Sequence, residues 1–303
     1  MASAEHNVEV DGRALKLTNL DKVLYPEVGF TKAEVINYYL QVAPTMIEHC
    51  RDRCVTLRRY PNGVAADSFF EKRCPKHRPE WIDTHLGPGD RNGDIGYCAF
   101  DERASLVWSA NLAALEIHTP MARAADLDVP QMVVFDFDPG PDVGMTECCE
   151  VALELSDLLD TIDLVAFPKT SGSKGLQVYV PLNSPAGQAH THDHAGSFAL
   201  AAGKVLEQRT PARITTTMAK RERTGRVFID WSQNSRHKTT VCPYSLRARP
   251  RPTISTPVTW GEVEEAANGG PLSFEADDVL ARLADVGDLF APTLTMIQRL
   301  PGG

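Results

Sequence analysis

Three aspartates stand at the ends of apolar runs in the second half of the chain. Asp136 and Asp138 lie one residue apart in Gln-Met-Val-Val-Phe-Asp-Phe-Asp-Pro-Gly (131–140), and Asp230 ends Arg-Val-Phe-Ile-Asp (226–230). In a β-strand, residues i and i+2 project to the same face, so both carboxylates of the pair point together. A third carboxylate on a neighbouring strand would complete a cluster of negative charge. Mg²⁺ and Mn²⁺ favour such oxygen ligands and share them with phosphates, so the pattern predicts a site for two divalent cations.

A segment of small residues, hydroxyls and one lysine follows the aspartate pair. Thr-Ser-Gly-Ser-Lys-Gly (170–175) joins two predicted strands. Small residues let backbone N–H groups approach an anion, and Lys174 supplies positive charge. The segment is not a Walker A loop, because the first glycine and the Ser/Thr after the lysine are absent. Alone it fits an ordinary tight turn equally well, but its place after the aspartates favours phosphate binding.

Charge is segregated along the chain. The net charge of -9 and a pI of about 5.5 argue, taken alone, against a nucleic-acid binder. Residues 213–251, however, contain ten Lys/Arg and two acids, whereas residues 136–163 contain nine acids and no base. A basic stretch around one buried acid indicates a phosphate-handling surface beside a metal site, although such runs are more often solvated faces. Lys238 and Arg247 are candidates for a triphosphate clamp, or they only neutralise Asp230 and its neighbours.

The bulk composition is that of a globular protein. The 303 residues are 43% hydrophobic and 23% charged, which allows one large domain or two closely joined ones. There is no signal sequence and no apolar run of about 18 residues, so we expect a soluble protein that is not exported. The seven cysteines lack CxxC spacing and are expected to be reduced thiols. Cys50-x3-Cys54 with Cys74-x2-His77 only faintly resembles a zinc knuckle.

The pattern of apolar residues predicts an α+β fold. It predicts helices over 31–49 (capped by Thr31 and interrupted at Pro44), 104–117, 146–160 and 193–208, and two short ones within 260–285. It predicts strands over 53–60, 131–137, 163–168, 176–181, 213–218, 226–231 and 239–244. The Pro- and Gly-rich stretch 73–95 is expected to be a surface loop. Strands interleaved with helices indicate a mixed sheet with helices packed on one face.

A set of ordered motifs resembles the archaeo-eukaryotic primase superfamily. It comprises Phe-Asp-Phe-Asp-Pro-Gly, Thr-Ser-Gly-Ser-Lys-Gly-Leu, Phe-Ile-Asp-Trp-Ser-Gln-Asn and Pro-Tyr-Ser-Leu-Arg. The sequence looks most like the polymerase domain of bacterial end-joining DNA ligase D and its stand-alone primase-polymerase relatives. The likeness covers nearly the whole chain, because Leu-Thr-Asn-Leu-Asp-Lys-Val-Leu-Tyr-Pro (17–26) and Phe-Phe-Glu-Lys (69–72) are also typical. It implies a primase-like catalytic core with a mixed or antiparallel RRM-like sheet and packed helices (126–303). An N-terminal α/β module (1–125) would touch template and 5′-phosphate, the two forming one compact unit.

The resemblance assigns expected roles to individual residues. Asp136, Asp138 and Asp230 would be catalytic and would ligate two metal ions, with Mn²⁺ preferred and Mg²⁺ possible. The nucleotide would be bound by His118, Ser171, Ser173, Lys174, Gln177, Lys238 and Arg247. The 5′-phosphate across a DNA gap would be gripped by Asn19, Lys22 and Lys32, and Phe69 and Phe70 would stack on template bases.

The sequence departs from the family pattern in two places. The family usually has His where this chain has Gln177, and that His contacts the triphosphate. Glutamine can donate a hydrogen bond but carries no positive charge, so nucleotide affinity or the preferred pH is expected to differ. The Trp usual shortly after the His of His118-Thr-Pro is also missing, with Met121-Ala-Arg123 in its place. Neither change removes a predicted metal ligand.

The function implied is that of a template-dependent nucleotidyltransferase that extends primer 3′-hydroxyls at short gaps or broken ends in DNA repair, favouring ribonucleotides. Its expected partners are gapped or broken DNA with a 5′-phosphate, NTPs and dNTPs, and a repair DNA ligase, without a membrane. The expected location is the cytoplasm, at the nucleoid.

Two other functional hypotheses remain open from the sequence. One is a non-catalytic DNA gap or end binder, which Gln177 in place of His would favour. The other is a haloacid-dehalogenase-like phosphohydrolase, which also places Asp-x-Asp after a strand. His190-Thr-His-Asp-His194 looks like a metal box, but a polar loop in which Asp193 caps the next helix is the preferred interpretation.

Overall fold

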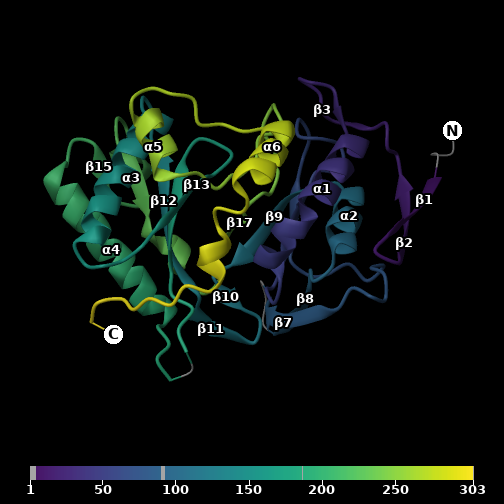
Figure 1. Ribbon diagram of the computed structural model, residues 1–303, viewed down its shortest axis with the longest axis horizontal. Helices are drawn as coiled ribbons and strands as arrows, with labels where there is room; N and C mark the ends of the chain where they lie inside the picture. Colours follow the sequence, from purple (N-terminus) through teal and green to yellow (C-terminus); the bar gives the residue numbers. More distant parts are fainter. Residues whose placement is uncertain (1–4, 90–92, 186, 303) are drawn as a thin grey trace. The chain divides into compact units, whose positions relative to one another are not determined.

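The chain is built from helices and several mostly antiparallel sheets (Figure 1). The structure, a computed structural model, describes residues 5–89, 93–185 and 187–302. It divides into two compact units. The first comprises residues 1–120, 241–254 and 274–285, and the second comprises 121–240, 255–273 and 286–303. Two segments from beyond the expected boundary at residue 125 therefore belong to the first unit.

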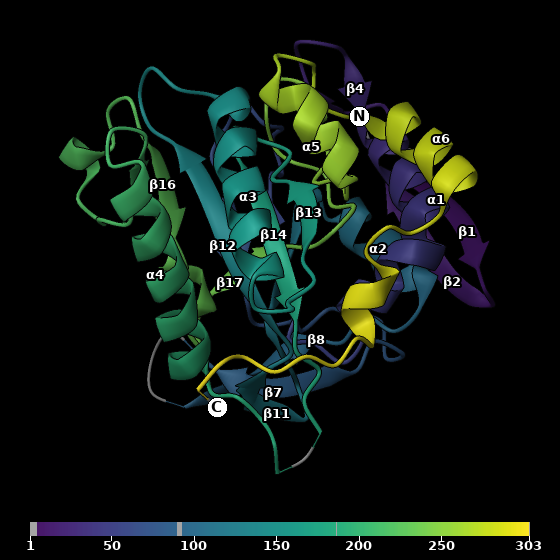
Figure 2. The ribbon, with the colours of Figure 1, turned by 60° about the vertical axis from the view of Figure 1, so that its left-hand side comes forward.

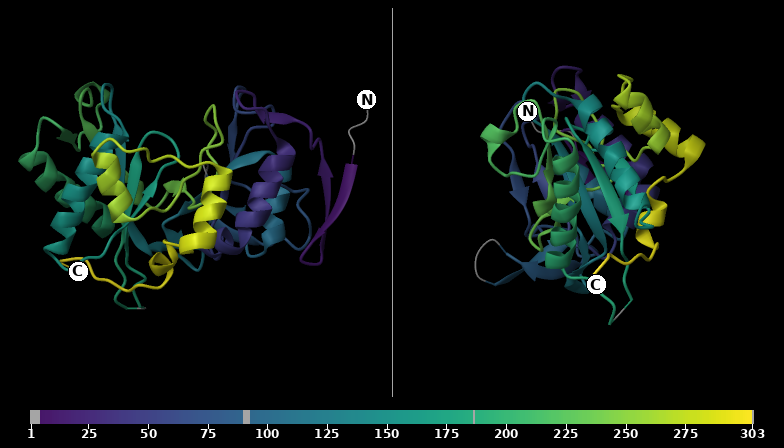
Figure 3. Two further views of the ribbon diagram at one scale, coloured as in Figure 1. Left: turned by 45° about the horizontal axis from the view of Figure 1, so that its top comes forward. Right: turned by 90° about the vertical axis from the view of Figure 1, so that its left-hand side faces the viewer.

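The first unit contains three helices and a four-stranded sheet, except that Thr239 and Thr240 of the edge strand β17 (Thr239–Val241) are assigned to the second unit. The sheet has the strand order β17, β9 (Ala114–Pro120), β5 (Thr56–Arg59) and β6 (Phe69–Glu71). The helices are α1 (Lys32–Cys50), α2 (Arg103–Asn111) and α6 (Ala276–Val286). Helix α1 begins at a capping box in which Thr31 and Glu34 bond each other's backbone N–H, and it continues through Pro44. Helices α1 and α2 lie side by side (Figure 3).

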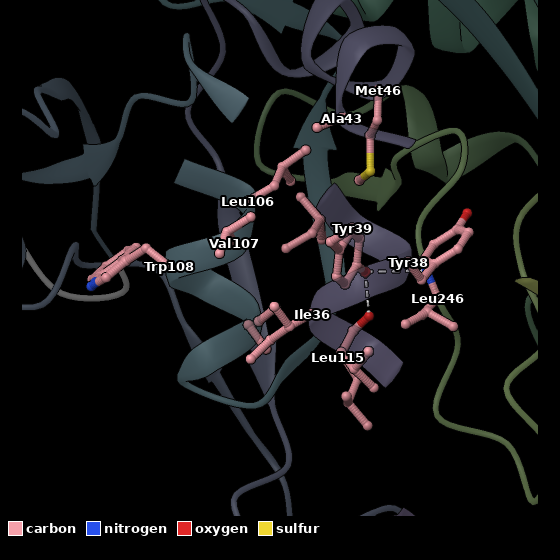
Figure 4. Packing of buried hydrophobic residues seen from close by; sticks show 14 of the residues in the cluster. Ile36, Tyr38, Tyr39, Ala43, Met46, Leu106, Val107, Trp108, Leu115 and Leu246 are labelled. Atoms are coloured by element: carbon pink, nitrogen blue, oxygen red, sulfur yellow. Dashed lines mark hydrogen bonds between the residues drawn. The ribbon is translucent and has the colours of Figure 1, made fainter. Parts of the chain in front are cut away.

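The core of the first unit joins α1, β9 and the segment after β17. The Tyr39 hydroxyl donates a hydrogen bond to the carbonyl of Leu115 at 2.6 Å and accepts one from the N–H of Leu246 at 3.2 Å (Figure 4). All three residues are fully buried. Through Tyr39, this packing fixes the position of strand β9 relative to residues 245–248.

Short hairpins complete the first unit. They pair β1 (Glu5–Val10) with β2 (Arg13–Thr18), β3 (Val23–Tyr25) with β4 (Phe30–Thr31), and β7 (Thr84–Pro88) with β8 (Asp94–Cys98). Hairpin β7–β8 corrects the expectation that 73–95 is only a loop. Cys74 forms a disulfide with Cys98, so the expectation that all seven cysteines are reduced thiols is wrong. Spacing could not reveal it, because tertiary folding pairs two cysteines separated by 24 residues.

The second unit holds a five-stranded sheet. Its order is β13 (Phe167–Thr170), β14 (Leu176–Pro181), β12 (Met132–Pro139), β16 (Val227–Asp230) and β15 (Ile214–Thr215). Strand β12 is antiparallel to both neighbours, whereas β15 is parallel to β16. Helices α3 (Met145–Asp160), α4 (His192–Arg209) and α5 (Trp260–Ala267) cover one face (Figure 2). The smaller elements are β10 (Ala122–Arg123), β11 (Asp126–Pro130) and the 3-10 turns Lys220–Glu222, Trp231–Asn234 and Ala291–Leu294.

Alternation along β12 separates an apolar face from an acidic one. Phe135 contacts Phe198 of α4, with ring centroids 6.2 Å apart, so odd-numbered residues of β12 face the helices. Even-numbered residues, including Asp136 and Asp138, therefore project from the other face of the sheet. The expected mixed α+β fold with helices packed on one face is confirmed.

One predicted helix is wrong. Residues 104–117 were expected to be helical throughout, but α2 ends at Asn111 and β9 begins at Ala114. The chain turns at Ala113, whose φ is +55°. Every residue of β9 is buried, and a fully buried strand shows no alternation that would distinguish it from an apolar helix. His118 is therefore presented by a strand.

Candidate functional site

The sheet register brings the three aspartates onto one face. Asp136 is the direct cross-strand partner of Asp230, and Asp138 lies two residues further along β12. Asp136 and Asp230 are 8% and 7% exposed, whereas Asp138 is solvent-exposed. Asp230 also accepts hydrogen bonds from the N–H and hydroxyl of Ser232, at 3.0 and 2.6 Å. Among the described residues, no three His, Cys, Asp or Glu side chains already stand in an arrangement ready to hold a metal ion.

The electrostatics of this face favour a cation. Burial, followed by the charges of the neighbouring Asp138 and Asp230, raises the pKa of Asp136 to about 7. A hydrogen bond from Gln177 and the charge of Lys169 act against this shift. The carboxylates are thus only partly neutralised by the protein itself. Three oxygen-donor side chains on one face are the donor set that Mg²⁺ and Mn²⁺ prefer.

The turn between β13 and β14 is organised around Ser171. Its Oγ accepts hydrogen bonds from the N–H groups of Ser173 and Gly175, each at 3.2 Å. A Cβ on Gly175 would lie 2.0 Å from the carbonyl oxygen of Phe137, so only glycine lets the turn approach β12 this closely. Ser173 and Lys174 are exposed at the tip of the turn. The turn therefore lies against the strand that carries Asp136 and Asp138.

Gln177 is buried beside Asp136. The two are direct partners across β14 and β12, and Gln177 is 4% exposed. Its Oε1 accepts hydrogen bonds from Lys169 Nζ at 2.6 Å and from the Tyr179 hydroxyl at 3.1 Å. Lys238, the other predicted nucleotide-binding residue of this unit, lies on the surface after the turn that follows Asp230.

In the first unit, Glu116 joins two of the predicted nucleotide-binding residues. Its carboxylate lies 3.0 Å from His118 Nε2 and 3.3 Å from Arg247 Nε, and it accepts the N–H of Ala248 at 3.1 Å. Burial alone would raise the pKa of Glu116, but His118 and Arg247 lower it to about 2. Burial lowers the pKa of His118 although Glu116 favours its protonated form. Glu116 was not among the site residues predicted from the sequence. Its only signal there is that it is an acid within an apolar run, two residues before His118.

The two predicted stacking residues lie on β6 next to this cluster. Phe69 and Phe70 are 45% and 55% exposed, which is unusual for adjacent phenylalanines. The Arg58 guanidinium lies 5.1 Å from the Phe70 ring centroid, and the rings of Phe70 and His118 are 5.5 Å apart. Both phenylalanines line a hollow of about 600 Å³ whose rim carries Lys72, Arg73 and Lys76.

The predicted 5′-phosphate residues gather at the start of α1. Lys32 is the first residue of the helix, and its N–H donates to the carbonyl of Lys22 at 2.8 Å. The Lys22 N–H in turn donates to the carbonyl of Asn19, a residue with φ of +54°. Burial, followed by the charges of Lys22 and Arg59, lowers the pKa of Lys32 to about 8. The two lysine side chains place positive charge at this position, which is suited to an anion.

Neither of the weaker metal motifs forms a metal cluster in the described chain. Cys74 of the zinc-knuckle pattern is bound in the disulfide. In the histidine box, His190 Nδ1 lies 2.9 Å from His194 Nδ1, and His192 Nδ1 lies 2.8 Å from the carbonyl of Asn234. Helix α4 is capped by Thr191 and not, as expected, by Asp193, which lies in its first turn. No helix in the described ranges is long and apolar enough to cross a membrane.

Comparison with known proteins gives consistent matches over most of the chain. The model of the family "LigD, primase-polymerase domain" matches residues 31–290. The multifunctional non-homologous end joining protein LigD of Mycolicibacterium smegmatis is 44% identical over 284 residues, which are 92% of this chain and 36% of that protein. The bifunctional non-homologous end joining protein LigD of Bacillus subtilis is 30% identical over 273 residues, 90% of this chain and 43% of that protein.

A solved structure matches the whole architecture. The polymerase domain from Mycobacterium tuberculosis ligase D, in complex with DNA, has a TM-score of 0.85 and 40% sequence identity to this chain. The match covers 94% of this chain and 99% of that one. The chain thus spans 36% of the LigD of Mycolicibacterium smegmatis but nearly all of a polymerase domain.

Proposed function

Because this chain belongs to the LigD primase-polymerase domain family, whose members are metal-dependent nucleotidyltransferases, we propose that it is a template-dependent polymerase of DNA end repair. It extends a primer 3′-hydroxyl with nucleoside triphosphates, prefers ribonucleotides, and fills short gaps at broken ends. The observation that carries this proposal is the cross-strand pair Asp136 and Asp230 with Asp138 on the same face.

The aspartates fit two divalent cations, with Mn²⁺ preferred. Asp136, Asp138 and Asp230 offer carboxylate oxygens, and a bound cation would favour the charged form of Asp136, whose pKa is raised by burial and then by the neighbouring acids. When bound, the two ions lower the pKa of the primer 3′-hydroxyl and stabilise the pyrophosphate that leaves. Asp136 and Asp138 project from the same face of β12. Ser232 restrains the Asp230 carboxylate through its two hydrogen bonds.

The nucleotide is held by groups from several elements. In the turn 171–175, the exposed Ser173 and Lys174 supply a hydroxyl and a charge for phosphate oxygens, while Ser171 maintains the turn. Lys238 adds an exposed positive charge. In the first unit, His118 and Arg247 bind phosphate oxygens from positions fixed by Glu116. Gln177 acts through Asp136, as argued below.

The DNA is bound by the first unit. The solved relative is a polymerase domain in complex with DNA, which supports DNA binding by this chain. Asn19, Lys22 and Lys32 receive the 5′-phosphate at the far side of a gap. Phe69 and Phe70 are exposed and stack on template bases. The guanidinium groups of Arg59 and Arg58 lie over their rings. A repair ligase is the natural next enzyme, because a filled gap leaves a nick that must be sealed.

Single-nucleotide incorporation into a short gapped duplex tests this function. Downstream strands with a 5′-phosphate or a 5′-hydroxyl, rNTP or dNTP, and Mn²⁺ or Mg²⁺ are compared. We expect strong ribonucleotide addition with Mn²⁺ that depends on the 5′-phosphate. Tight gap binding without incorporation under any metal would instead establish a non-catalytic end binder. The family match leaves the dehalogenase-like phosphohydrolase without support.

A further inference from the structure

A lysine that was not among the predicted site residues is buried beside the acidic face. Lys169, on β13, has 0% exposure. Its Nζ donates hydrogen bonds to Gln177 Oε1 and to Ser255 Oγ, each at 2.6 Å, and lies 5.5 Å from the centroid of the Tyr179 ring. Ser255 Oγ donates its own hydrogen to the carbonyl of Thr170 at 2.8 Å, so its lone pairs are available to the lysine. Burying an ammonium group is costly, and this site surrounds it with acceptors and a ring face.

The lysine determines which way the Gln177 amide points. An ammonium group only donates hydrogen bonds, so the amide atom that faces it at 2.6 Å must be the oxygen. The Tyr179 hydroxyl lies against the same oxygen at 3.1 Å. The amide nitrogen of Gln177 must then point the other way and donate.

The acceptor of that donation is Asp136. Gln177 and Asp136 are direct partners across β14 and β12, and their side chains are hydrogen bonded. A linear chain of contacts thus runs from Lys169 through the amide of Gln177 to one carboxylate of the acidic face. Partners of this kind, one step behind a metal ligand, orient the ligand and tune its affinity for the ion.

We propose that Lys169 is a positioning residue that, through Gln177, holds the Asp136 carboxylate in the orientation that binds a divalent cation. The inference rests on the proposed function, because it takes Asp136 as a metal ligand. It also gives Gln177 a role in this chain: Lys169 orients the Gln177 amide, and the amide in turn orients the Asp136 carboxylate.

Mn²⁺ binding to the protein without nucleotide or DNA tests the inference directly. Free Mn²⁺ is followed by electron paramagnetic resonance during titration of the wild type and of Lys169→Met, which keeps a long side chain but removes the donor. We expect the substitution to weaken Mn²⁺ binding by about 10- to 100-fold. Tyr179→Phe is the matched control. It removes the hydroxyl, which is the second donor to Gln177 Oε1, and it keeps the aromatic ring over Lys169. Its effect should be distinctly smaller.

A double-mutant cycle separates positioning from a general loss of charge or of folding. Gln177→Leu removes the link while Lys169 stays, and it should weaken Mn²⁺ binding as well. If Lys169 acts through Gln177, the double variant binds Mn²⁺ no more weakly than Gln177→Leu alone. Additive losses would overturn the inference, as would wild-type Mn²⁺ affinity in Lys169→Met. Circular dichroism confirms that each variant is folded, and the leucine background provides a second comparison if Lys169→Met alone does not fold.

Asp136→Ala, measured alongside, distinguishes the two levels of the argument. If Mn²⁺ binding by the wild type does not depend on Asp136, both the proposed metal site and this inference fail. If binding depends on Asp136 but not on Lys169, only this inference fails and the proposed function stands. In the incorporation assay, Lys169→Met should require more Mn²⁺ for half-maximal rate while the KM for gapped DNA stays unchanged.

Discussion

The two units each bury a carboxylate in the middle of a sheet, but they treat its charge in opposite ways. Glu116 on β9 and Asp136 on β12 are 2% and 8% exposed, and each has a second polar residue two positions further along its strand. Glu116 is surrounded by His118, Arg247 and a backbone N–H, which lower its pKa to about 2 in spite of burial. Burial and two further acids raise the pKa of Asp136 to about 7.

This difference in pKa indicates different roles: Glu116 positions its neighbours, whereas Asp136 is suited to bind a cation. The Glu116 cluster is neutralised by the protein's own cations, so it is complete as folded and serves to orient His118 and Arg247. The aspartate face gathers three acids that Lys169 offsets only in part, and an added cation would offset the remainder. Substitutions on the two sides should therefore fail in different ways.

The largest expected effect follows the removal of an aspartate. Asp136→Ala or Asp138→Ala should abolish nucleotide incorporation, because each removes a ligand that no neighbouring side chain replaces. Binding to gapped DNA should remain, since the residues proposed to contact DNA lie in the first unit. Gel-shift and primer-extension assays on the same preparations check both statements. Normal incorporation by either variant would show that the aspartates are not the metal ligands.

Asp136→Asn tests the charge on the aspartate face through protein stability, without an activity measurement. It relieves repulsion among the acids, so the metal-free variant should melt at a higher temperature than the metal-free wild type. Added Mn²⁺ should stabilise the wild type through mass action but should leave the variant unchanged. Differential scanning calorimetry with and without Mn²⁺ measures both. A lower melting temperature for the metal-free variant would contradict the view that this face is strained by its own charge.

Glu116→Gln should weaken the cluster that Glu116 forms with His118 and Arg247 in the first unit. Glutamine keeps the shape but loses the charge, leaving His118 and Arg247 held by weaker hydrogen bonds, at a cost of about 1.5–3 kcal/mol in stability. The KM for the nucleotide should rise more than kcat falls, because the orientation of binding groups is lost. Steady-state kinetics of rNTP incorporation tests this split.

Acid unfolding gives an independent check on Glu116. Because its folded pKa is about 2, against an ordinary value of 4.5, the charged carboxylate stabilises the fold above pH 4.5. That contribution is lost as the pH falls from 4.5 towards 2, since the unfolded chain takes up the proton first. Glu116→Gln should show a flatter fall in stability across this window, measured by urea unfolding at several pH values.

A smaller effect concerns the exposed phenylalanines. Phe70→Ala should weaken template binding by about 1–3 kcal/mol through lost base stacking. Phe70→Tyr keeps a ring that can stack and is the matched control. Affinity for a gapped duplex with an unpaired template base, compared with a fully paired duplex, isolates the stacking contribution. An equal loss on both duplexes would indicate a structural role for the ring.

The parts of this picture that were predictable from the sequence depend on local periodicity. The alternation of apolar and acidic residues in 131–138 placed Asp136 and Asp138 on one face of a strand, and the register of β12 with β16 then set Asp230 beside them. Helices α3 and α4 were likewise evident from their spacing. In each case the pattern lies within the strand or helix itself, and only the pairing of β12 with β16 required the structure.

What could not be predicted depends on contacts between distant segments. Glu116 meets Arg247 across 131 residues of sequence, and it lies in a stretch that had been interpreted as helix. The disulfide between Cys74 and Cys98 and the contact of Lys169 with Ser255, 86 residues apart, are of the same kind. No local pattern encodes these pairings, because they form only when the sheet and the segments that cross it are assembled.

The smallest expected effect is a pH dependence at the start of α1. The pKa of Lys32 is lowered to about 8 by burial and by the charges of Lys22 and Arg59, so the lysine loses its proton as the pH rises through that value. A 5′-phosphate favours the charged form, and its preference over a 5′-hydroxyl should therefore shrink several-fold as the pH rises through 8. Lys32→Met should show a weak preference at every pH. Lys22→Met should retain the pH dependence but move it to higher pH, because one of the charges that lower the pKa of Lys32 is removed. Affinities of the two duplexes between pH 6.5 and about 9.5, below the ordinary lysine value, test this. A preference that is constant over that range would mean that Lys32 does not meet the phosphate.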